Sequence, residues 1–236
     1  MIKVTYLYHS GFAVETANHF LVFDYWRNTP AKGGLSDGVI NPEELKDKNV
    51  IVFASHRHKD HYNEVIHSWQ EVIKDCRIIL SDDINSKDGA LMVSPRGRYE
   101  ADDYILRTFK SNDEGVAFLV TIDGINIYHA GDLNWWHWEG EKGSWNEDIK
   151  KSYIQEIDSI GNEVIDLAFV PLDPRLNLQY SWGLDYFMKT TNTNVVIPMH
   201  FGRKTEVIKR LLEDDISFNY RSRIKPLIAR GESLTI

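Results

Sequence analysis

Three histidines and an aspartate lie within six consecutive positions of the stretch SHRHKDH, directly after the apolar run NVIVFA. They are His56, His58, Asp60 and His61. Imidazole binds zinc, manganese, iron and similar ions, and a carboxylate can bind a second ion or orient the attacking water. His56 and His58 are two residues apart in an extended segment, so both rings can face one point, while Asp60 and His61 can face a second point at the following turn. The pattern favours one or two divalent transition-metal ions, zinc first and manganese or iron as alternatives, over a chance cluster on a solvated loop.

The surrounding sequence indicates which elements position this motif. Residues 49–55 are typical of a buried strand, apolar residues at helical spacing follow from Val65 to Ile73, and Asp123-Gly124 is a hairpin signal. Further strands are predicted at 2–8, 12–17, 19–25, 104–110, 116–122, 125–130, 166–171 and 194–199, and helices at about 147–160, 184–189 and 205–214. Two similar halves that alternate β-rich and helical segments fit an α/β fold with two packed sheets under outer helices, a four-layer αββα sandwich.

Composition limits the class of protein. The chain has 236 residues, of which 42% are hydrophobic and 12% aromatic, and no linker divides it, so we expect a single domain over residues 1–236. A net charge of −8 argues against a nucleic-acid partner. Cys76 is the only cysteine, which excludes an intramolecular disulfide, and no apolar run reaches the length of a membrane span. We therefore expect a cytoplasmic protein that acts on a small-molecule substrate and has no membrane partner.

Three motifs carry a resemblance to a known family. SHRHKDH resembles the signature of the metallo-β-lactamase superfamily, and YHAGDLN and VVIPMHFG resemble its two later motifs. Members share the αββα sandwich and mostly hydrolyse esters, lactones, amides or phosphodiesters at one or two metals. The resemblance implies that Asp132 bridges the two metals and that His200 completes the second site. The implied ligands are Asp60, His61, Asp132 and His200 for the second ion, and His56, His58 and Asp132 for the first.

One motif of the family is missing. The superfamily normally supplies a third histidine to the first metal, but this chain has no histidine between His67 and His129, and FKSNDEG occupies the expected place. Asp113 is a candidate oxygen ligand there, which would favour harder ions such as manganese. The alternatives are that Asp113 caps its loop, or that the first site is weak or empty.

Several residues outside the ligand set are candidates for substrate binding. The opening YLYHSGFAVE resembles ascorbate-6-phosphate lactonase-like hydrolases, in which the first hairpin runs beside the metals, so His9 is a candidate. The loop DLNWWHWEGEKGSW could form an aromatic wall, and PLDPRL could bind a polar or anionic substrate group. The other candidates are His129, Trp135, Trp138, Asp173 and Arg175. Each has a structural alternative: a turn or buried histidine, loop packing, or a salt bridge.

These assignments define a reaction. A bound metal lowers the pKa of its water from 15.7 toward about 7, so a hydroxide forms at neutral pH, and Asp60 would hold and orient it as the catalytic carboxylate. We therefore predict a metallo-hydrolase of a small ester, lactone or phosphoester. The alternatives are a nuclease-type phosphodiesterase, disfavoured by the acidic charge, and a non-catalytic metal-binding or sensing protein, for which the missing histidine is the one supporting feature.

Overall fold

The structure, a computed structural model, describes residues 1–85 and 89–236. The chain forms two compact units. Unit 1 contains Met1–Gly97 and Leu227–Ile236, and unit 2 contains Arg98–Pro226. The expectation of a single domain stays a prediction, and each unit is described by itself. Within the described residues, no helix is both long and apolar enough to cross a membrane.

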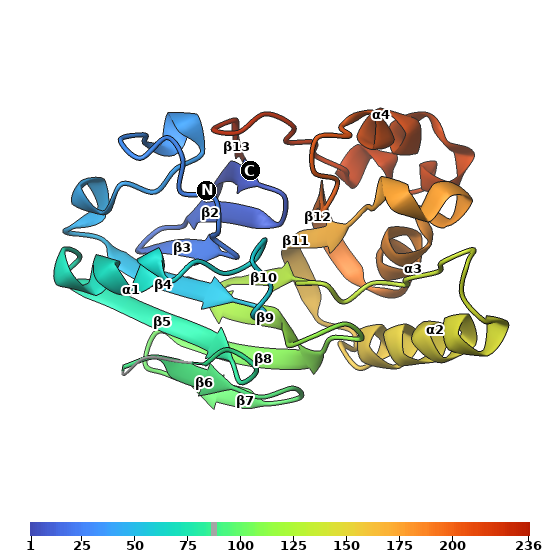
Figure 1. Ribbon diagram of the computed structural model, residues 1–236, viewed down its shortest axis with the longest axis horizontal. Helices are drawn as coiled ribbons and strands as arrows, with labels where there is room; N and C mark the ends of the chain where they lie inside the picture. The colour runs from blue at the N-terminus through green and yellow to red at the C-terminus, as the bar shows by residue number, and fades with distance from the viewer. Residues whose placement is uncertain (86–88) are drawn as a thin grey trace. The chain divides into compact units, whose positions relative to one another are not determined.

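Unit 1 is built on a mixed sheet in the order β13-β1-β2-β3-β4-β5-β6 (Figure 1). Its strands are β1 (Lys3–Tyr8), β2 (Gly11–Glu15), β3 (His19–Phe23), β4 (Asn49–Ala54), β5 (Asp75–Ser81), β6 (Leu91–Val93) and β13 (Ser233–Thr235). Strands β3 to β6 run parallel, whereas β1 pairs antiparallel with β2 and with β13. In the β3–β4 pair Phe23 lies opposite Phe53. The two strands therefore end side by side, and the residues that follow them are neighbours.

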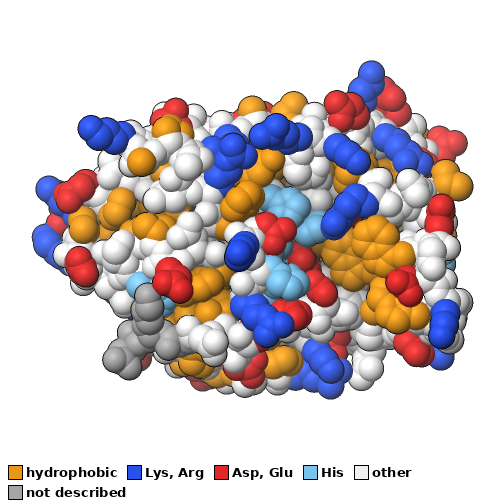
Figure 2. Space-filling view, viewed as in Figure 1, with side chains coloured by type: hydrophobic (Ala, Val, Ile, Leu, Met, Phe, Trp, Pro, Cys, Tyr) orange, Lys and Arg blue, Asp and Glu red, His pale blue; other side chains and the backbone are white. Residues whose placement is uncertain are grey.

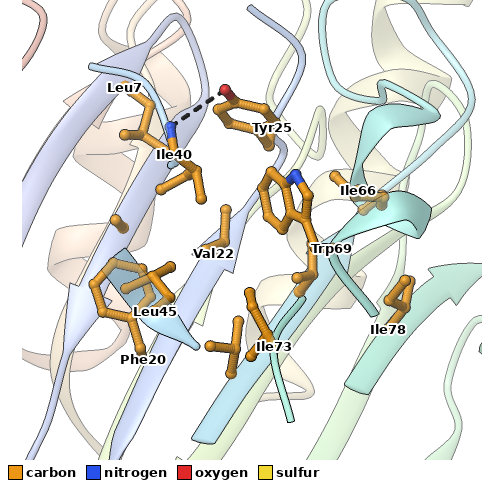
Figure 3. Packing of buried hydrophobic residues seen from close by; sticks show 14 of the residues in the cluster. Leu7, Phe20, Val22, Tyr25, Ile40, Leu45, Ile66, Trp69, Ile73 and Ile78 are labelled. Atoms are coloured by element: carbon orange, nitrogen blue, oxygen red, sulfur yellow. Dashed lines mark hydrogen bonds between the residues drawn. The ribbon is translucent and has the colours of Figure 1, made fainter. Parts of the chain in front are cut away.

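Packing on one face of this sheet fixes the segment after β4. The predicted helix there is a short α-helix, α1 (Val65–Ser68), which continues as the 3₁₀ turn η3 (Trp69–Glu71). Trp69 is buried and its ring lies 5.0 Å from that of Tyr25. Figure 3 shows Trp69 among aliphatic side chains that come from the sheet, such as Val22, and from the helical segment, such as Ile66. It also shows the Tyr25 hydroxyl accepting a hydrogen bond from the backbone N–H of Ile40. The 3₁₀ turns η1 (Leu35–Asp37) and η2 (Pro42–Leu45) precede β4.

Unit 2 is built on a second mixed sheet, in the order β12-β11-β10-β9-β8-β7 (Figure 1). Its strands are β7 (Arg98–Glu100), β8 (Tyr104–Lys110), β9 (Val116–Ile122), β10 (Ile125–His129), β11 (Val164–Pro171) and β12 (Asn192–Met199). The Asp123-Gly124 hairpin between β9 and β10 is confirmed, and both turn residues have positive φ, 50° and 76°. Strands β10, β11 and β12 run parallel, so their carboxyl ends lie at one edge of the sheet.

The helices of unit 2 connect these strands. They are α2 (Gly143–Asp158), α3 (Trp182–Thr190) and α4 (Glu206–Glu213), with the 3₁₀ segments η4 (Pro174–Gln179), η5 (Asp215–Ser217) and η6 (Arg221–Arg223). All three predicted helices exist, although α2 begins and ends earlier than expected. An α/β fold with two mixed sheets is thus confirmed.

Trp69 should be the most sensitive core position in the cluster of Figure 3. Trp69→Ala removes a fully buried indole and leaves a cavity, so we expect the free energy of unfolding to fall by about 3–5 kcal/mol, measured by urea denaturation. The exposed neighbour change Glu71→Ala should alter it by less than about 0.5 kcal/mol. A loss below about 1 kcal/mol in Trp69→Ala would contradict this account of the core.

Candidate metal centre

The site in unit 1 is organised by Asp24, the residue after β3. Its carboxylate lies 2.7 Å from the backbone nitrogen of Ser55, 2.7 Å from the Ser55 hydroxyl and 2.7 Å from Nδ1 of His61. Asp24, Ser55 and His61 are all 0% exposed. Because a carboxylate only accepts, Nδ1–H of His61 donates to it, and the lone pair of the ring stays on Nε2. Asp24 thus orients His61 as a metal ligand would need.

His56 and His58 lie beside this pair. The Ser55 hydroxyl is 3.0 Å from Nδ1 of His56, and Nε2 of His56 is 3.0 Å from Nδ1 of His58. The His56 ring also lies 4.1 Å from the His61 ring, centroid to centroid. The three predicted histidine ligands of unit 1 are therefore gathered at one turn, and His56 and His58 are close enough for one ion to contact both.

Asp60 and His9 form the outer part of the same group. His9, Asp60 and His61 each offer one ligand atom, and these atoms lie within 4.8 Å of one another. Nε2 of His9 is 3.6 Å from Oδ2 of Asp60, whose side chain is half exposed. His9 has a positive φ of 60°, and its backbone N–H donates to the Tyr6 hydroxyl at 2.8 Å. A strained turn thus places His9 beside the proposed catalytic carboxylate.

Unit 2 has a corresponding arrangement around His200, which follows β12. Nδ1 of His200 is 3.0 Å from Oδ2 of Asp173, and Nε2 is 3.3 Å from Oδ1 of Asp132. Burial lowers the pKa of His200, but the Asp132 and Asp173 carboxylates raise it, to about 10. Burial raises the pKa of Asp173, yet hydrogen bonds from His200 and Arg175 bring it well below its usual range. The two carboxylates thus stabilise positive charge at His200, and a divalent ion bound at Nε2 would have to displace the proton on that nitrogen.

Asp113, the candidate substitute for the missing histidine, lies in the loop between β8 and β9. Its carboxylate and that of Asp132 each offer an oxygen, the two within 4.8 Å of one another. The neighbouring Asn112 side chain donates to the Asn134 carbonyl at 2.8 Å and accepts from the Asn134 N–H at 3.3 Å. This pair of hydrogen bonds ties the Asp113 loop to the Asp132 loop, so the two carboxylates are held together.

The predicted substrate residues of unit 2 occupy different places. Trp138 and Arg175 line a cavity of about 380 Å³, and the Arg175 guanidinium lies 5.5 Å from the centre of the Trp138 ring. Arg175, whose side chain is 57% exposed, also donates to both oxygens of the buried Asp173. His129 is fully buried, and its Nδ1 accepts from the Gly131 N–H at 3.1 Å. Trp135 lines a separate cavity.

Two residues that touch the predicted ligands carry no sequence signal of their own. Asp24 is one, because an aspartate after a strand is also typical of a solvated turn. Trp136 is the other: its ring lies 5.4 Å from that of His200, and its Nε1–H donates to the Asp132 carbonyl at 2.9 Å. The sequence indicates an aromatic loop here but does not distinguish Trp136 from its neighbouring tryptophans.

The residues of both units fit bound divalent ions. Each unit has a buried histidine whose Nδ1 faces a carboxylate, which leaves Nε2 as the ligand atom: His61 with Asp24, and His200 with Asp173. Such carboxylate–histidine pairs commonly orient metal ligands. The remaining donors are imidazoles and carboxylates, which suit zinc, manganese or iron.

Comparison with known proteins identifies the family. A model of the β-lactamase superfamily domain matches residues 3–137, more than half of the chain. The chain belongs to the metallo-β-lactamase superfamily. A relative from Opitutus terrae named UPF0173 metal-dependent hydrolase is 22% identical over 225 residues, which cover 87% of each chain.

Solved structures agree on the fold. Igni18, a metallo hydrolase from Ignicoccus hospitalis, has a TM-score of 0.62 at 18% identity and covers 100% of this chain and 98% of its own. The metallo-β-lactamase fold protein YhfI from Bacillus subtilis has a TM-score of 0.60 at 15% identity and covers 100% of both chains. The predicted fold class is confirmed, as is the class of metallo-hydrolase at the level of the family.

Asp24 should control metal affinity without binding the metal. Asp24→Asn keeps the size of the side chain but removes the charge that faces Nδ1 of His61, so we expect metal affinity to fall about 10- to 100-fold, measured by titrating zinc into metal-free protein. Asp83→Asn is the matched control, since Asp83 also accepts a backbone hydrogen bond, from Arg57, in the same loop region. Equal affinities in both variants would exclude the orienting role.

Asp113 should act on only part of the bound metal. If it supplies an oxygen ligand, Asp113→Ala should lower the number of ions bound per chain or weaken one of two binding steps, seen by manganese titration and elemental analysis. The exposed Asp102→Ala in the same unit serves as the control. Two equally tight ions in Asp113→Ala would remove Asp113 from the ligand set and leave it as a loop residue.

Proposed function

We propose that this protein hydrolyses a small ester, lactone or phosphoester with water activated by one or two divalent transition-metal ions, zinc favoured. The observation that carries the proposal is the pair of buried histidines, His61 and His200, each with a carboxylate on Nδ1. Burying four ionisable groups in this way is unfavourable unless a further interaction compensates. Metal coordination at Nε2 is the compensation that this donor set is suited to give.

The assignment of both groups of donors to one activity rests on the order of motifs that the superfamily shares. We assign His56, His58, Asp60 and His61 of unit 1 and Asp113, Asp132 and His200 of unit 2 as ligands. When bound, a divalent ion lowers the pKa of its water from 15.7 to about 7 and so supplies the nucleophile at neutral pH. No serine or cysteine nucleophile is needed for this chemistry.

Asp60 is the proposed catalytic carboxylate. It is more exposed than the histidines around it, so water can reach it, and it accepts hydrogen bonds when ionised. We assign it the task of holding the attacking water and receiving its proton. His9, 3.6 Å away, can donate to Asp60 or to the substrate, which supports a role for the first hairpin like that in the lactonase-like subgroup.

The cavity beside Trp138 and Arg175 is the proposed place for the non-reacting part of the substrate. Its volume of about 380 Å³ suits a small molecule. Trp138 offers an apolar face and Arg175 a guanidinium, while Glu139 and Glu141 also line the cavity. A polar or anionic substrate group would therefore bind on the Arg175 side, away from these two carboxylates. Trp136 stacks on Trp138 with centroids 6.0 Å apart and also contacts His200, so one aromatic stack links this cavity to a proposed metal ligand.

Asp132→Ala is the sharpest test of the proposed function. Removing a carboxylate that faces His200 should lower metal content, and hydrolysis of 4-nitrophenyl acetate or bis(4-nitrophenyl) phosphate should fall more than about 100-fold with it. Metal content is measured by elemental analysis after growth with added zinc and manganese.

His67→Ala provides the matched control, because His67 bonds to the Tyr62 hydroxyl at 2.8 Å and belongs to neither group of donors. It should keep its metal and its activity. Wild-type protein without metal, or an Asp132→Ala variant with unchanged metal content and activity, would refute the proposal. Bound metal without hydrolysis of any tested ester would favour a sensing role.

A further inference from the structure

Unit 2 contains a second cavity that is lined by none of the proposed metal ligands. It has a volume of about 430 Å³ and lies between the Trp-rich loop, α2 and α3. The lining residues used below are Trp135, His137, Glu147, Lys150, Trp182 and Asp185. Figure 2 shows hydrophobic side chains gathered on the surface where Figure 1 draws this loop and α3. A cavity of this size accepts a small organic molecule.

Aromatic rings make up the sides of the cavity. The Trp135 and Trp182 rings are 5.5 Å apart at 67°, and the His137 and Trp182 rings are 4.9 Å apart at 61°. Tyr186 adds a fourth ring, 6.1 Å from Trp135 at 74°. Nearly perpendicular rings present faces and edges in alternation, which suits a flat aromatic guest because stacked and edge-to-face contacts are both favourable.

The charges at the cavity favour an anionic guest over a cationic one. Asp185 is already neutralised, since its carboxylate contacts the Lys189 ammonium at 2.8 Å and the Tyr220 hydroxyl at 3.0 Å. The Lys150 ammonium lies 5.5 Å from the centre of the Trp135 ring, and its ion-pair partner Glu147 is 3.8 Å away. This ion pair is long and its side chains are 39% and 59% exposed, so it is weak and leaves the ammonium able to pair with a guest. An organic cation would meet this ammonium at the aromatic face, whereas an anion would be attracted to it.

Trp135 supplies a second feature that suits an anion. Its indole Nε1–H is buried and has no hydrogen-bond partner among the described residues. Buried donors are normally satisfied, so an acceptor atom on a guest would compensate for the missing bond. Trp135 and His137 are also the sequence neighbours of Trp136, whose ring contacts His200. A molecule in this cavity would therefore contact both neighbours of Trp136.

We propose that this cavity is a binding site for a planar aromatic carboxylate, with its ring packed against Trp135 and Trp182 and its negative group at Lys150. The site is separate from the metal ligands and does not depend on bound metal. An experiment that refutes the proposed hydrolase activity therefore leaves this binding site untouched, and the reverse also holds.

Three naphthalene probes of one shape test the charge preference. They are 2-naphthoate, 2-naphthalenemethanol and 2-naphthylmethylammonium, titrated by calorimetry into full-length protein treated with a chelator. We expect saturable binding with one site per chain, tightest for the carboxylate and weakest for the ammonium. The absence of saturable binding of 2-naphthoate, or equal or tighter binding of the ammonium probe, would overturn the proposal.

Variants locate the site. Lys150→Met keeps most of the apolar stem and should weaken 2-naphthoate binding about tenfold while leaving the neutral alcohol unchanged, since a charged contact is lost. Lys151→Met, one position along α2 at an exposed residue, is the matched control and should bind as wild type. Trp182→Leu should weaken the binding of all three naphthalene probes.

Thermal unfolding of each variant checks that it is folded. Equal losses in Lys150→Met and Lys151→Met would place the anion elsewhere and refute the assignment. Wild-type affinity in a folded Trp182→Leu variant would exclude this cavity as the site.

Discussion

A single buried carboxylate holds the site of unit 1 together. Asp24 has no exposed surface, and burying such a charge is unfavourable by several kcal/mol unless hydrogen bonds replace its water. It receives those bonds from Ser55, twice, and from His61. The parallel pairing of β3 with β4 makes this possible because it ends the two strands side by side. The end of one strand, the start of the loop and the turn after it are thereby fixed to one point, and the histidines of the motif are placed with them.

In unit 2, too, a buried carboxylate orients a buried histidine, and this carboxylate has a cationic partner. Asp173 follows β11 and faces His200, which follows the parallel neighbour β12. Asp173 also pairs with an arginine that reaches solvent. One carboxylate therefore connects a buried histidine to the surface cavity that Arg175 lines. A substrate group that drew Arg175 away would change the hydrogen bonding of Asp173 and, through it, the basicity of His200.

The sequence predicted those features that depend on local patterns. The strands β1 to β4 and β8 to β12, the Asp123-Gly124 hairpin and the three longer helices follow from periodicity and turn residues within short windows. Strands β5, β6, β7 and β13 were not predicted. The last three are three residues long, too short to show an alternation, and they exist because neighbouring strands offer hydrogen bonds. The helix after the motif is shorter than its apolar spacing indicates, since Trp69 packs on Tyr25 from a 3₁₀ turn.

The motif histidines could also be predicted from the sequence, because three of them lie within six positions. The carboxylates that orient the histidines could not be predicted in this way. Asp24 is 37 positions from His61, and only strand pairing brings them together. The position of PLDPRL after a strand predicts that Asp173 and Arg175 bind a substrate group or form a salt bridge. It does not predict the contact of Asp173 with His200, which depends on the parallel alignment of β11 with β12. Local sequence reveals which side chains can do chemistry, whereas tertiary contacts decide which of them tune the others.

The pairing of β1 with β13 affects how the protein folds during synthesis on the ribosome. Thr5 of β1 bonds to Ser233 of β13, 228 positions later, and in the same segment Arg230 donates to the carbonyls of Leu7, Thr29 and Gly38. At about 5–20 residues per second, translation needs roughly 10 to 45 s to cover that separation. During this interval the outer edge of β1 is an open strand edge, which can recruit other chains. Unit 2 is continuous in sequence and is therefore synthesised in full before β13 is available to unit 1. The sheet of unit 1, whose first strands are made earliest, is thus the later of the two sheets to gain its final strand.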